Sequence, residues 1–288
     1  MDLICVGDAM LDVRVDAGEL ARGGDVHGTV RLHPGGTSAN AAVWAVSSGS
    51  SARVHAKVGR DLPGRLLRTE LEARGVEASL VEDPEARTGT MLVVHEAGER
   101  SMVADRGANA RLRPADLPET LEAGAVLVSG YLLLQEGARE AGVEALRRAR
   151  APLVAVDAAS WPLVEAVGRP GFHELAAAAT GVLANEREAA SLTGLEPEAA
   201  AKALGERYRL GCVKLGAEGA VLVLDGEVHR SPSDAVEELD PTGAGDAFDG
   251  VLLGSLARGA DPAEALRAAC RAGAAVAASR SAWPEASG

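Results

Sequence analysis

The sequence of 288 residues has few aromatic side chains: two Phe, two Tyr and three Trp. A hydrophobic core must therefore be built mainly from Ala, Val and Leu. Cysteine is also scarce. Cys5, Cys212 and Cys270 lie far apart in apolar runs, so buried thiols are expected in place of a disulfide or a metal site. The chain has no apolar run of about 18 residues, as a membrane span would require. Residues 1–7 lack the basic segment of a signal peptide, and we expect a cytoplasmic protein.

Other absences exclude several classes of function. The formal net charge of −13 argues against a nucleic-acid partner, because phosphates would be repelled. The first expected strand is followed by Gly7-Asp8-Ala9-Met10 and not by the G-x-G-x-x-G sequence of a dinucleotide-binding dehydrogenase. A P-loop requires Lys directly after Gly, whereas all three lysines follow Ala or Val. The six histidines show no spacing typical of metal ligands.

Short apolar segments alternate with segments rich in Ala, Leu, Arg and Glu. This alternation predicts an α/β fold with a mainly parallel central sheet and helices on both faces. The expected strands are residues 3–6, 54–58, 125–129, 153–157, 181–184, 212–215 and 220–224. The expected helices are residues 39–47, 64–74, 137–150, 197–207, 244–258 and 262–279. Ligands in such folds bind at the carboxyl ends of the strands.

Two segments interrupt this alternation. Residues 11–34 alternate in polarity and contain several glycines, and residues 88–106 are typical of a hairpin with strands 90–95 and 101–105 joined by a turn at 96–99. The two segments are expected to pair into a small separate sheet, or else to extend the edge of the main sheet. Residues 281–288 are expected to be a frayed end.

The segment Asp240-Pro241-Thr242-Gly243-Ala244-Gly245-Asp246 precedes a long apolar run that is typical of a helix. Gly243, Ala244 and Gly245 should form its first turn, where unpaired N–H groups and the helix dipole favour a bound phosphate. Asp246 beside that phosphate is a poor anion ligand but a good general base for an attacking hydroxyl. The alternative is an ordinary helix start with a glycine turn.

A second glycine cluster, Gly35-Gly36, leads into another expected helix. Asn40 lies in the first turns of that helix, where an amide can donate to and accept from sugar hydroxyls. Gly59-Arg60-Asp61 and Gly64 form a further turn after an expected strand.

Together these residues resemble the two signatures of the PfkB (ribokinase-like) carbohydrate kinases. The first comprises Gly35 to Asn40 and the turn at residues 59–64, and the second comprises residues 240–248. Thr88-Gly89-Thr90, Asn185-Glu186-Arg187-Glu188 and the loop from Lys214 to Gly219 are similar to further landmarks of the family and follow in its order. The resemblance implies a single three-layer α/β domain over residues 1–288, with a β-sheet lid from about residues 11–34 and 88–106.

The resemblance also implies roles for individual residues, with ATP and Mg²⁺ as cofactors. Asp246 would be the catalytic base, with Gly243, Ala244 and Gly245 as the anion hole. The acceptor would contact Asp12, Gly35, Gly36, Asn40 and Arg106, and the nucleotide would contact Asn185, Lys214, Gly216, Gly219, Thr242, Ala272 and Ala275. Glu188 would reach the metal ion, through water. Asp240 would either reach metal-bound water or orient the loop.

Several of these residues also have an ordinary structural interpretation. Asp12 could be a hairpin acid, Glu188 a solvated helix residue and Arg106 a surface charge, while Ala272 and Ala275 could belong to a core-facing helix surface. Asp240 before Pro241 also suits a turn.

The favoured function is phosphoryl transfer from ATP to a hydroxyl of a small sugar or, through Arg106, a sugar acid. A nucleoside kinase of the same fold is the first alternative, although only Tyr131 and Trp44 are available to stack on a base. A Gly-Tyr pair at residues 130–131, where ribokinases tend to carry an acid, weakens ribose as the acceptor. A non-catalytic sugar-binding sensor is the second alternative. The lid could also join two copies of the chain into a homodimer.

Overall fold

The fold is built around a large twisted sheet in the computed structural model, which describes residues 1–21, 23–96, 99–234 and 236–284. Within these residues, nine strands form the sheet in the order β15-β14-β13-β12-β11-β9-β1-β4-β5. They are β1 (Leu3–Val6), β4 (Ala52–Gly59), β5 (Glu77–Asp83), β9 (Ala125–Ser129), β11 (Leu153–Asp157), β12 (Gly181–Asn185), β13 (Leu210–Lys214), β14 (Ala220–Leu224) and β15 (Glu227–Ser231). Neighbouring strands from β13 to β5 are parallel, and β14 pairs antiparallel with both β13 and β15.

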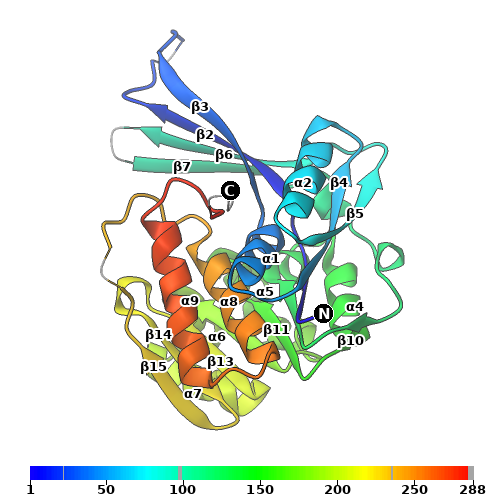
Figure 1. The fold of residues 1–288 in the computed structure, drawn as a ribbon, viewed down its shortest axis with the longest axis vertical. Helices are drawn as coiled ribbons and strands as arrows, with labels where there is room; N and C mark the ends of the chain where they lie inside the picture. Colours follow the sequence, from blue (N-terminus) through cyan, green and yellow to red (C-terminus); the bar gives the residue numbers. More distant parts are fainter. Residues whose placement is uncertain (22, 97–98, 235, 285–288) are drawn as a thin grey trace.

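Helices cover both faces of this sheet (Figure 1). One face packs against α1 (Thr37–Ser47), α2 (Leu62–Ala73), α8 (Ala244–Ala257) and α9 (Pro262–Ala277). The other packs against α3 (Gly130–Leu134), α4 (Arg139–Arg148), α5 (Trp161–Leu175), α6 (Glu186–Thr193) and α7 (Pro197–Tyr208). The central strands β1, β9, β11 and β12 are almost entirely apolar because both of their faces are buried. In β1, Leu3 and Cys5 join the first core and Ile4 and Val6 the second.

A second, smaller sheet stands apart from the central one and projects beyond it (Figure 1). It has the order β3-β2-β6-β7 and is called the small sheet below. Its strands are β2 (Met10–Ala17), β3 (Gly28–Gly35), β6 (Gly89–Glu96) and β7 (Glu99–Asp105). The β2–β6 pair is parallel, and the β2–β3 and β6–β7 pairs are antiparallel. The prediction of a small separate sheet is therefore confirmed. Residues 97 and 98 of the expected hairpin turn lie outside the described residues.

The small sheet is joined to the main body through the turn at residues 59–64. Asp61 caps α2 by accepting from the amide of Gly64 at 3.0 Å, and its carboxylate also accepts from the amide and hydroxyl of Thr88. A Cβ on Gly59 would lie 2.5 Å from the amide nitrogen of Thr88. This part of the first signature therefore anchors the start of β6.

The C-terminal segment differs from its prediction as a frayed end. Ala282 and Trp283 are 1% and 5% exposed and belong to the core beside α1 and α8. Residues 285–288 lie outside the described residues. The buried indole of Trp283 donates a hydrogen bond to Asn40, so this segment contributes to the candidate site described next.

Candidate active site

The start of α8 is formed as the glycine pattern predicts. Gly243 is the N-cap residue, with a left-handed φ of +88° that favours glycine. A Cβ at this position would lie 2.9 Å from the Cβ of Ala282, so a larger residue would collide. No side-chain hydrogen bond caps the helix among the described residues. Gly243 and Gly245 line a cavity, and the helix start is therefore available to an anion.

Asp246 lies in the first turn of α8 and is oriented by Asn40. The Asn40 Nδ2 atom donates to Oδ2 of Asp246 at 2.7 Å, and the Asn40 Oδ1 atom accepts from Nε1 of Trp283 at 2.7 Å. Because an indole N–H can only donate, Trp283 fixes which end of the amide faces Asp246. Burial raises the pKa of Asp246 from 3.8 to about 7, although the Asn40 hydrogen bond opposes the rise.

The backbone just before Asn40 is packed against the main chain of Asp8 and the carboxylate of Asp12. A Cβ on Gly36 would lie 2.6 Å from the carbonyl oxygen of Asp8, and one on Gly35 would lie 2.7 Å from Oδ2 of Asp12. These close approaches explain why the sequence has two glycines here. Asp12 is 5% exposed, and burial raises its pKa to about 6, while Arg14 opposes the rise and Asp240 adds to it.

Arg106 has partners already. Its Nη2 atom forms an ion pair with Oδ2 of Asp8, and its guanidinium lies 4.3 Å from the centre of the Tyr131 ring. Asp8 is 1% exposed, and its second oxygen, Oδ1, is buried with no hydrogen-bond partner among the described residues. Burial raises the pKa of Asp8, and Arg106 opposes that rise. The arginine is therefore neither a bare surface charge nor an unpaired cation.

Lys214 ends β13 inside a cluster of carboxylates. Its Nζ atom lies 2.8 Å from Oδ2 of Asp157, at the end of β11, and 3.0 Å from both oxygens of Asp249, on α8. Burial alone would lower the pKa of Lys214, but the two carboxylates outweigh it and hold the pKa well above its usual value. Burial raises the pKa of Asp249 well above normal. The ammonium group is thus fixed beside Gly245, whose Cβ position lies 3.4 Å from Nζ.

Asn185 and Glu188 form a reciprocal cap at the start of α6. The Glu188 amide donates to Asn185 Oδ1 at 3.0 Å, and the Asn185 amide donates to Glu188 Oε2 at 2.8 Å. Glu188 is 4% exposed and not a solvated helix residue. Burial, followed by repulsion from Asp157, raises its pKa to about 7.

A cavity of about 810 Å³ joins the start of α8 with Asp246 to Lys214 and to the Asn185–Glu188 cap. Its lining includes four acidic residues and two basic ones: Asp157, Glu186, Glu188, Asp246, Arg187 and Lys214. Within the described part of the chain, no three His, Cys, Asp or Glu side chains are placed to hold a metal ion by themselves. A cation that arrives bound to phosphates and keeps several waters still fits, because it needs only one or two carboxylates.

A second cavity of about 380 Å³ adjoins the first, since both include Lys214, Gly216, Pro241 and Gly245 in their linings. It also includes Gly219, and it is mostly apolar where α8 and α9 face it, through Phe248, Cys270, Gly273, Ala274 and Ala277. Ala272 is instead buried in the core and Ala275 is exposed, so neither of these expected contacts lines the cavity. The face of α9 that lines it is rotated from the one we predicted.

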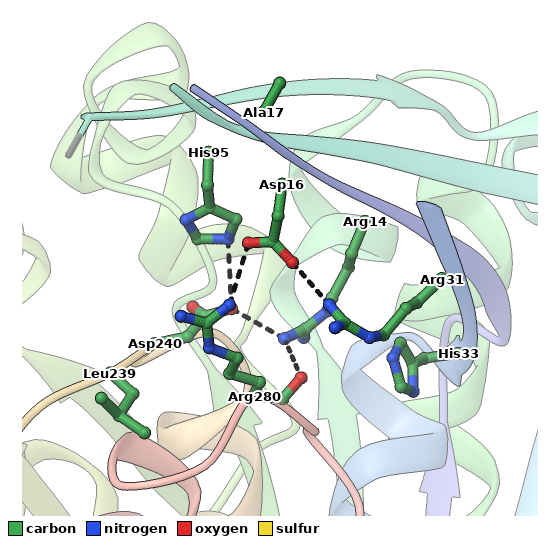
Figure 2. Close-up of a pocket in the computed structure, with 9 residues that line it drawn as sticks. All are labelled: Arg14, Asp16, Ala17, Arg31, His33, His95, Leu239, Asp240 and Arg280. Atoms are coloured by element: carbon green, nitrogen blue, oxygen red, sulfur yellow. Dashed lines mark hydrogen bonds and ion pairs between the residues drawn. The ribbon is translucent and has the colours of Figure 1, made fainter. Parts of the chain in front are cut away.

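A third cavity, of about 440 Å³, lies between the small sheet and the segment before α8 (Figure 2). Asp240 lines this cavity, and its Oδ1 atom accepts from the amide and the hydroxyl of Thr242 at 2.9 and 2.6 Å. These bonds support the loop-orienting role for Asp240 over contact with a metal in the first cavity.

Comparison with known proteins assigns the family. The sequence profile described as pfkB family carbohydrate kinase matches residues 1–285. The chain belongs to this family. It is therefore a carbohydrate kinase, and the prediction from the two signatures is confirmed.

Individual PfkB relatives differ in the acceptor that they are named for. The chain is 32% identical to a ribokinase of Bacillus subtilis over 277 residues, which cover 93% of this chain and 90% of that protein. It is 32% identical to a 2-dehydro-3-deoxygluconokinase of Thermoproteus tenax over 261 residues, covering 85% and 79%. The crystal structure of aminoimidazole riboside kinase from Salmonella enterica, complexed with aminoimidazole riboside and an ATP analogue, matches with a TM-score of 0.81 at 25% identity, covering 98% and 95%.

Several residues of this PfkB site were not predicted from the sequence. Asp8, Asp157, Asp249 and Trp283 all contact predicted site residues. For Asp8 and Asp157 a signal existed at the ligand-binding edge of the sheet, because Asp8 lies two residues after the apolar strand β1 and Asp157 ends the apolar strand β11. Trp283 offered none, since its partner Asn40 is far away in sequence.

No helix in the described ranges is long and apolar enough to cross a membrane.

Proposed function

We propose that the protein transfers the γ-phosphoryl group of ATP to a hydroxyl of a small sugar, with Asp246 as the general base. The observation that carries the proposal is the placement of Asp246. It lies at a helix start that no side chain of the described residues caps, it is oriented by Asn40 at 2.7 Å, and its pKa is raised to about 7. A base whose pKa lies near the operating pH combines a useful ionised fraction with a strong pull on the proton.

The proposed step is a direct displacement at phosphorus. The ionised Asp246 accepts the proton of the acceptor hydroxyl as its oxygen forms a bond to the γ-phosphorus, and the bond to the bridging oxygen of ATP breaks to release ADP. The amides around Gly243, Ala244 and Gly245 stabilise the charge on the transferring group, because they belong to the first turn of α8. The proton then leaves Asp246 when the phosphorylated product departs.

The nucleotide is proposed to occupy the two adjoining cavities. The apolar cavity beside α8 and α9 suits a base, and the larger one suits the phosphates. Gly216 and Gly219, with φ values of +57° and +99°, turn the intervening loop, and Lys214 and Thr242 lie beside the phosphate path. Asn185 lines the same cavity. The complex of aminoimidazole riboside kinase with an ATP analogue supports ATP as the nucleotide.

Mg²⁺ is proposed to accompany the nucleotide. The larger cavity has more acidic than basic side chains, so free triphosphate would be repelled, whereas a metal-bound triphosphate would not. Glu188 and Asp157 would hold the ion, through water or directly. When bound, the ion would neutralise charge on the phosphates during transfer.

The acceptor is proposed to lie near Asn40, Gly36, Asp12 and Asp8. The ion pair between Asp8 and Arg106 neutralises the arginine, which favours a hydroxyl-rich neutral sugar over a sugar acid at this position. The Oδ1 atom of Asp8, which has no hydrogen-bond partner in the described part of the chain, offers a further acceptor for a sugar hydroxyl.

The small sheet is proposed to act as a lid that excludes water from the acceptor. Its outer face exposes Val30, Leu32 and Val103, at 64%, 58% and 64% of their surfaces. We propose that a second copy of the chain covers these side chains, which sedimentation of the purified protein tests directly. A monomer at all concentrations would contradict this part of the proposal.

Two alternatives are less well supported. A nucleoside kinase needs an aromatic surface for the base, but one face of Tyr131 already stacks on Arg106, and Trp44 donates to the carbonyl of Ala282 at 2.8 Å. A sugar sensor would not need a base with a pKa near 7. Tight sugar binding without ATP turnover would decide for the sensor.

The experiment that tests the function is an ADP-release screen. The acceptors are ribose, fructose, 2-keto-3-deoxygluconate, tagatose 6-phosphate and nucleosides, each measured with and without Mg²⁺. We expect Mg²⁺-dependent turnover with a neutral sugar. No turnover with any sugar, but turnover with a nucleoside, would establish the first alternative instead.

A further inference from the structure

Arg14 is a buried cation that links the small sheet to the catalytic loop. It lies on β2 and is only 4% exposed. Its Nη1 atom donates to Oδ2 of Asp240 at 2.7 Å and to the main-chain carbonyl of Arg280 at 2.7 Å (Figure 2). One nitrogen therefore joins three segments: the small sheet, the loop before α8 and the turn after α9.

Asp240 connects Arg14 to the loop that forms the proposed anion hole. While Oδ2 binds Arg14, Oδ1 accepts from the amide and hydroxyl of Thr242, and the Asp240 amide donates to the carbonyl of Ala277 at 3.1 Å. Thr242 is followed directly by Gly243, the N-cap of α8. A shift of the Asp240 carboxylate would therefore move the backbone that presents the first-turn amides.

The contacts of Arg14 are of the strong kind. Both are short, one acceptor is a carboxylate that is 3% exposed, and hydrogen bonds of charged groups in buried surroundings are stronger than those at a surface. Asp12, two residues earlier on β2, lies 3.9 Å from Arg14 Nη2, so the guanidinium also faces the acceptor side of the site. The Nε2 atom of His95 lies 3.7 Å from Oδ2 of Asp240, which is beyond hydrogen-bond distance.

We propose that Arg14 is a positioning residue for phosphoryl transfer. It holds the loop at residues 240–243 in the geometry that the transferring phosphate requires, and it makes this geometry depend on the position of the small sheet. The inference rests on the proposed function, because it assigns Arg14 to the same anion hole. The main-chain carbonyl of Arg280 completes the link from the other side.

Two neighbouring arginines provide matched controls. Arg31 lies on β3 beside the same cavity, and its side chain, 45% exposed, pairs with Asp16 of the same small sheet. The Arg280 side chain, 64% exposed, also pairs with Asp16, at 3.2 Å. Arg280→Ala keeps the main-chain carbonyl that accepts from Arg14. Both substitutions remove a cation from the cavity without removing the bonds of Arg14.

The test compares Arg14→Ala with Arg31→Ala and Arg280→Ala. Arg14→Ala should lower kcat by about 10- to 100-fold, the rate equivalent of one or two charged hydrogen bonds, with the Kd for ATP changed by less than about threefold. The two controls should stay within about twofold of the wild type. Added guanidinium at sub-denaturing concentration should restore part of the kcat of Arg14→Ala only.

A readout without turnover separates this inference from the proposed function. Hydrogen exchange at residues 239–247 should become faster in Arg14→Ala and not in the controls. If the wild type transfers phosphate to no acceptor, the proposed function fails, and exchange still tests the link. Should Arg14→Ala not fold, Arg14→Gln takes its place in both measurements. A kcat within twofold of the wild type, or unchanged exchange at residues 239–247, would overturn the proposal.

Discussion

Replacing Asp246 by Asn tests two consequences of a carboxylate at the start of α8: its role as a base in catalysis and its effect on the stability of the fold. The amide has nearly the same shape, and its oxygen can still accept from Nδ2 of Asn40, which donates at 2.7 Å in the structure. It cannot accept a proton from the acceptor hydroxyl. Loss of a general base costs about 10²–10⁴ in rate, so kcat should fall by that factor while ATP and sugar still bind.

The same substitution should make the fold more stable at neutral and alkaline pH. Burial raises the pKa of Asp246 from 3.8 to about 7. Between these values the folded protein holds a proton that the unfolded chain releases, so the wild type loses stability as pH rises from about 4 to about 7. A difference of about three between the two pKa values corresponds to about 4 kcal/mol in the free energy of unfolding. Asp246 lines an open cavity, and solvent reduces the expected gain to about 2 kcal/mol.

Thermal unfolding at two pH values measures this gain. A chain of 288 residues has an unfolding entropy of about 0.6 kcal/mol/K, so about 2 kcal/mol raises Tm by about 3 °C. We expect this increase for Asp246→Asn at pH 8 and a smaller one at pH 5. Asp25→Asn is the control, because Asp25 is exposed in the segment between β2 and β3. A near-native kcat, or a Tm difference that does not grow with pH, would refute the reasoning.

Three further predictions concern the acceptor, the metal and the small sheet. Asp8→Asn removes the partner of Arg106 and should shift the ratio of kcat/KM toward sugar acids by about tenfold, and an unchanged ratio would show that the ion pair does not set acceptor charge. Glu188→Gln should raise the Mg²⁺ concentration for half-maximal activity by about tenfold, whereas Glu186→Gln, exposed in the same turn, should not; equal effects would remove Glu188 from the metal site. Saturating sugar should slow hydrogen exchange in β2, β3, β6 and β7, and unchanged exchange would contradict closure of the small sheet.

The strands that the sequence predicted best are buried on both faces. Residues 3–6, 125–129, 153–157 and 220–224 coincide with β1, β9, β11 and β14, because a continuous apolar run between turn residues has few other interpretations. The edge strands β5 (Glu77–Asp83) and β15 (Glu227–Ser231) were missed. Both contain several charged or polar residues, which an edge strand tolerates because one side faces water.

Helices were missed where local sequence obscures the period. The segment of α5 (Trp161–Leu175) contains Gly168, with a non-helical φ of +71°, and Pro170, so two short helical pieces meet at a kink. The expected helix at residues 137–150 ends at Arg148, and Ala149–Arg150 instead pairs with Leu121–Glu122. Propensity cannot reveal such a short pairing between distant segments.

The residues of the candidate site were likewise predictable only where their role leaves a mark on the neighbouring sequence. Gly36, Gly243 and Asp246 were predictable because a left-handed φ, a close backbone approach and a helix start each leave a trace in neighbouring residues. The ion pairs of Lys214 with Asp249 and of Arg14 with Asp240 leave no such trace. Each joins elements that only the completed fold brings together, so the partner of a buried charge could not be inferred from its own surroundings in sequence.

The C-terminal segment shows how much can depend on a residue without a local signal. Trp283 determines which end of the Asn40 amide faces Asp246. Ala282 occupies the space into which a side chain at position 243 would project. The Ala282 carbonyl also accepts from Trp44 on α1, which fixes the segment in place. The orientation of the proposed base and the shape of the proposed anion hole therefore both depend on a turn that follows the last helix. Composition alone made that turn look like a frayed end, because a single indole contributes little to any average although it makes one decisive hydrogen bond.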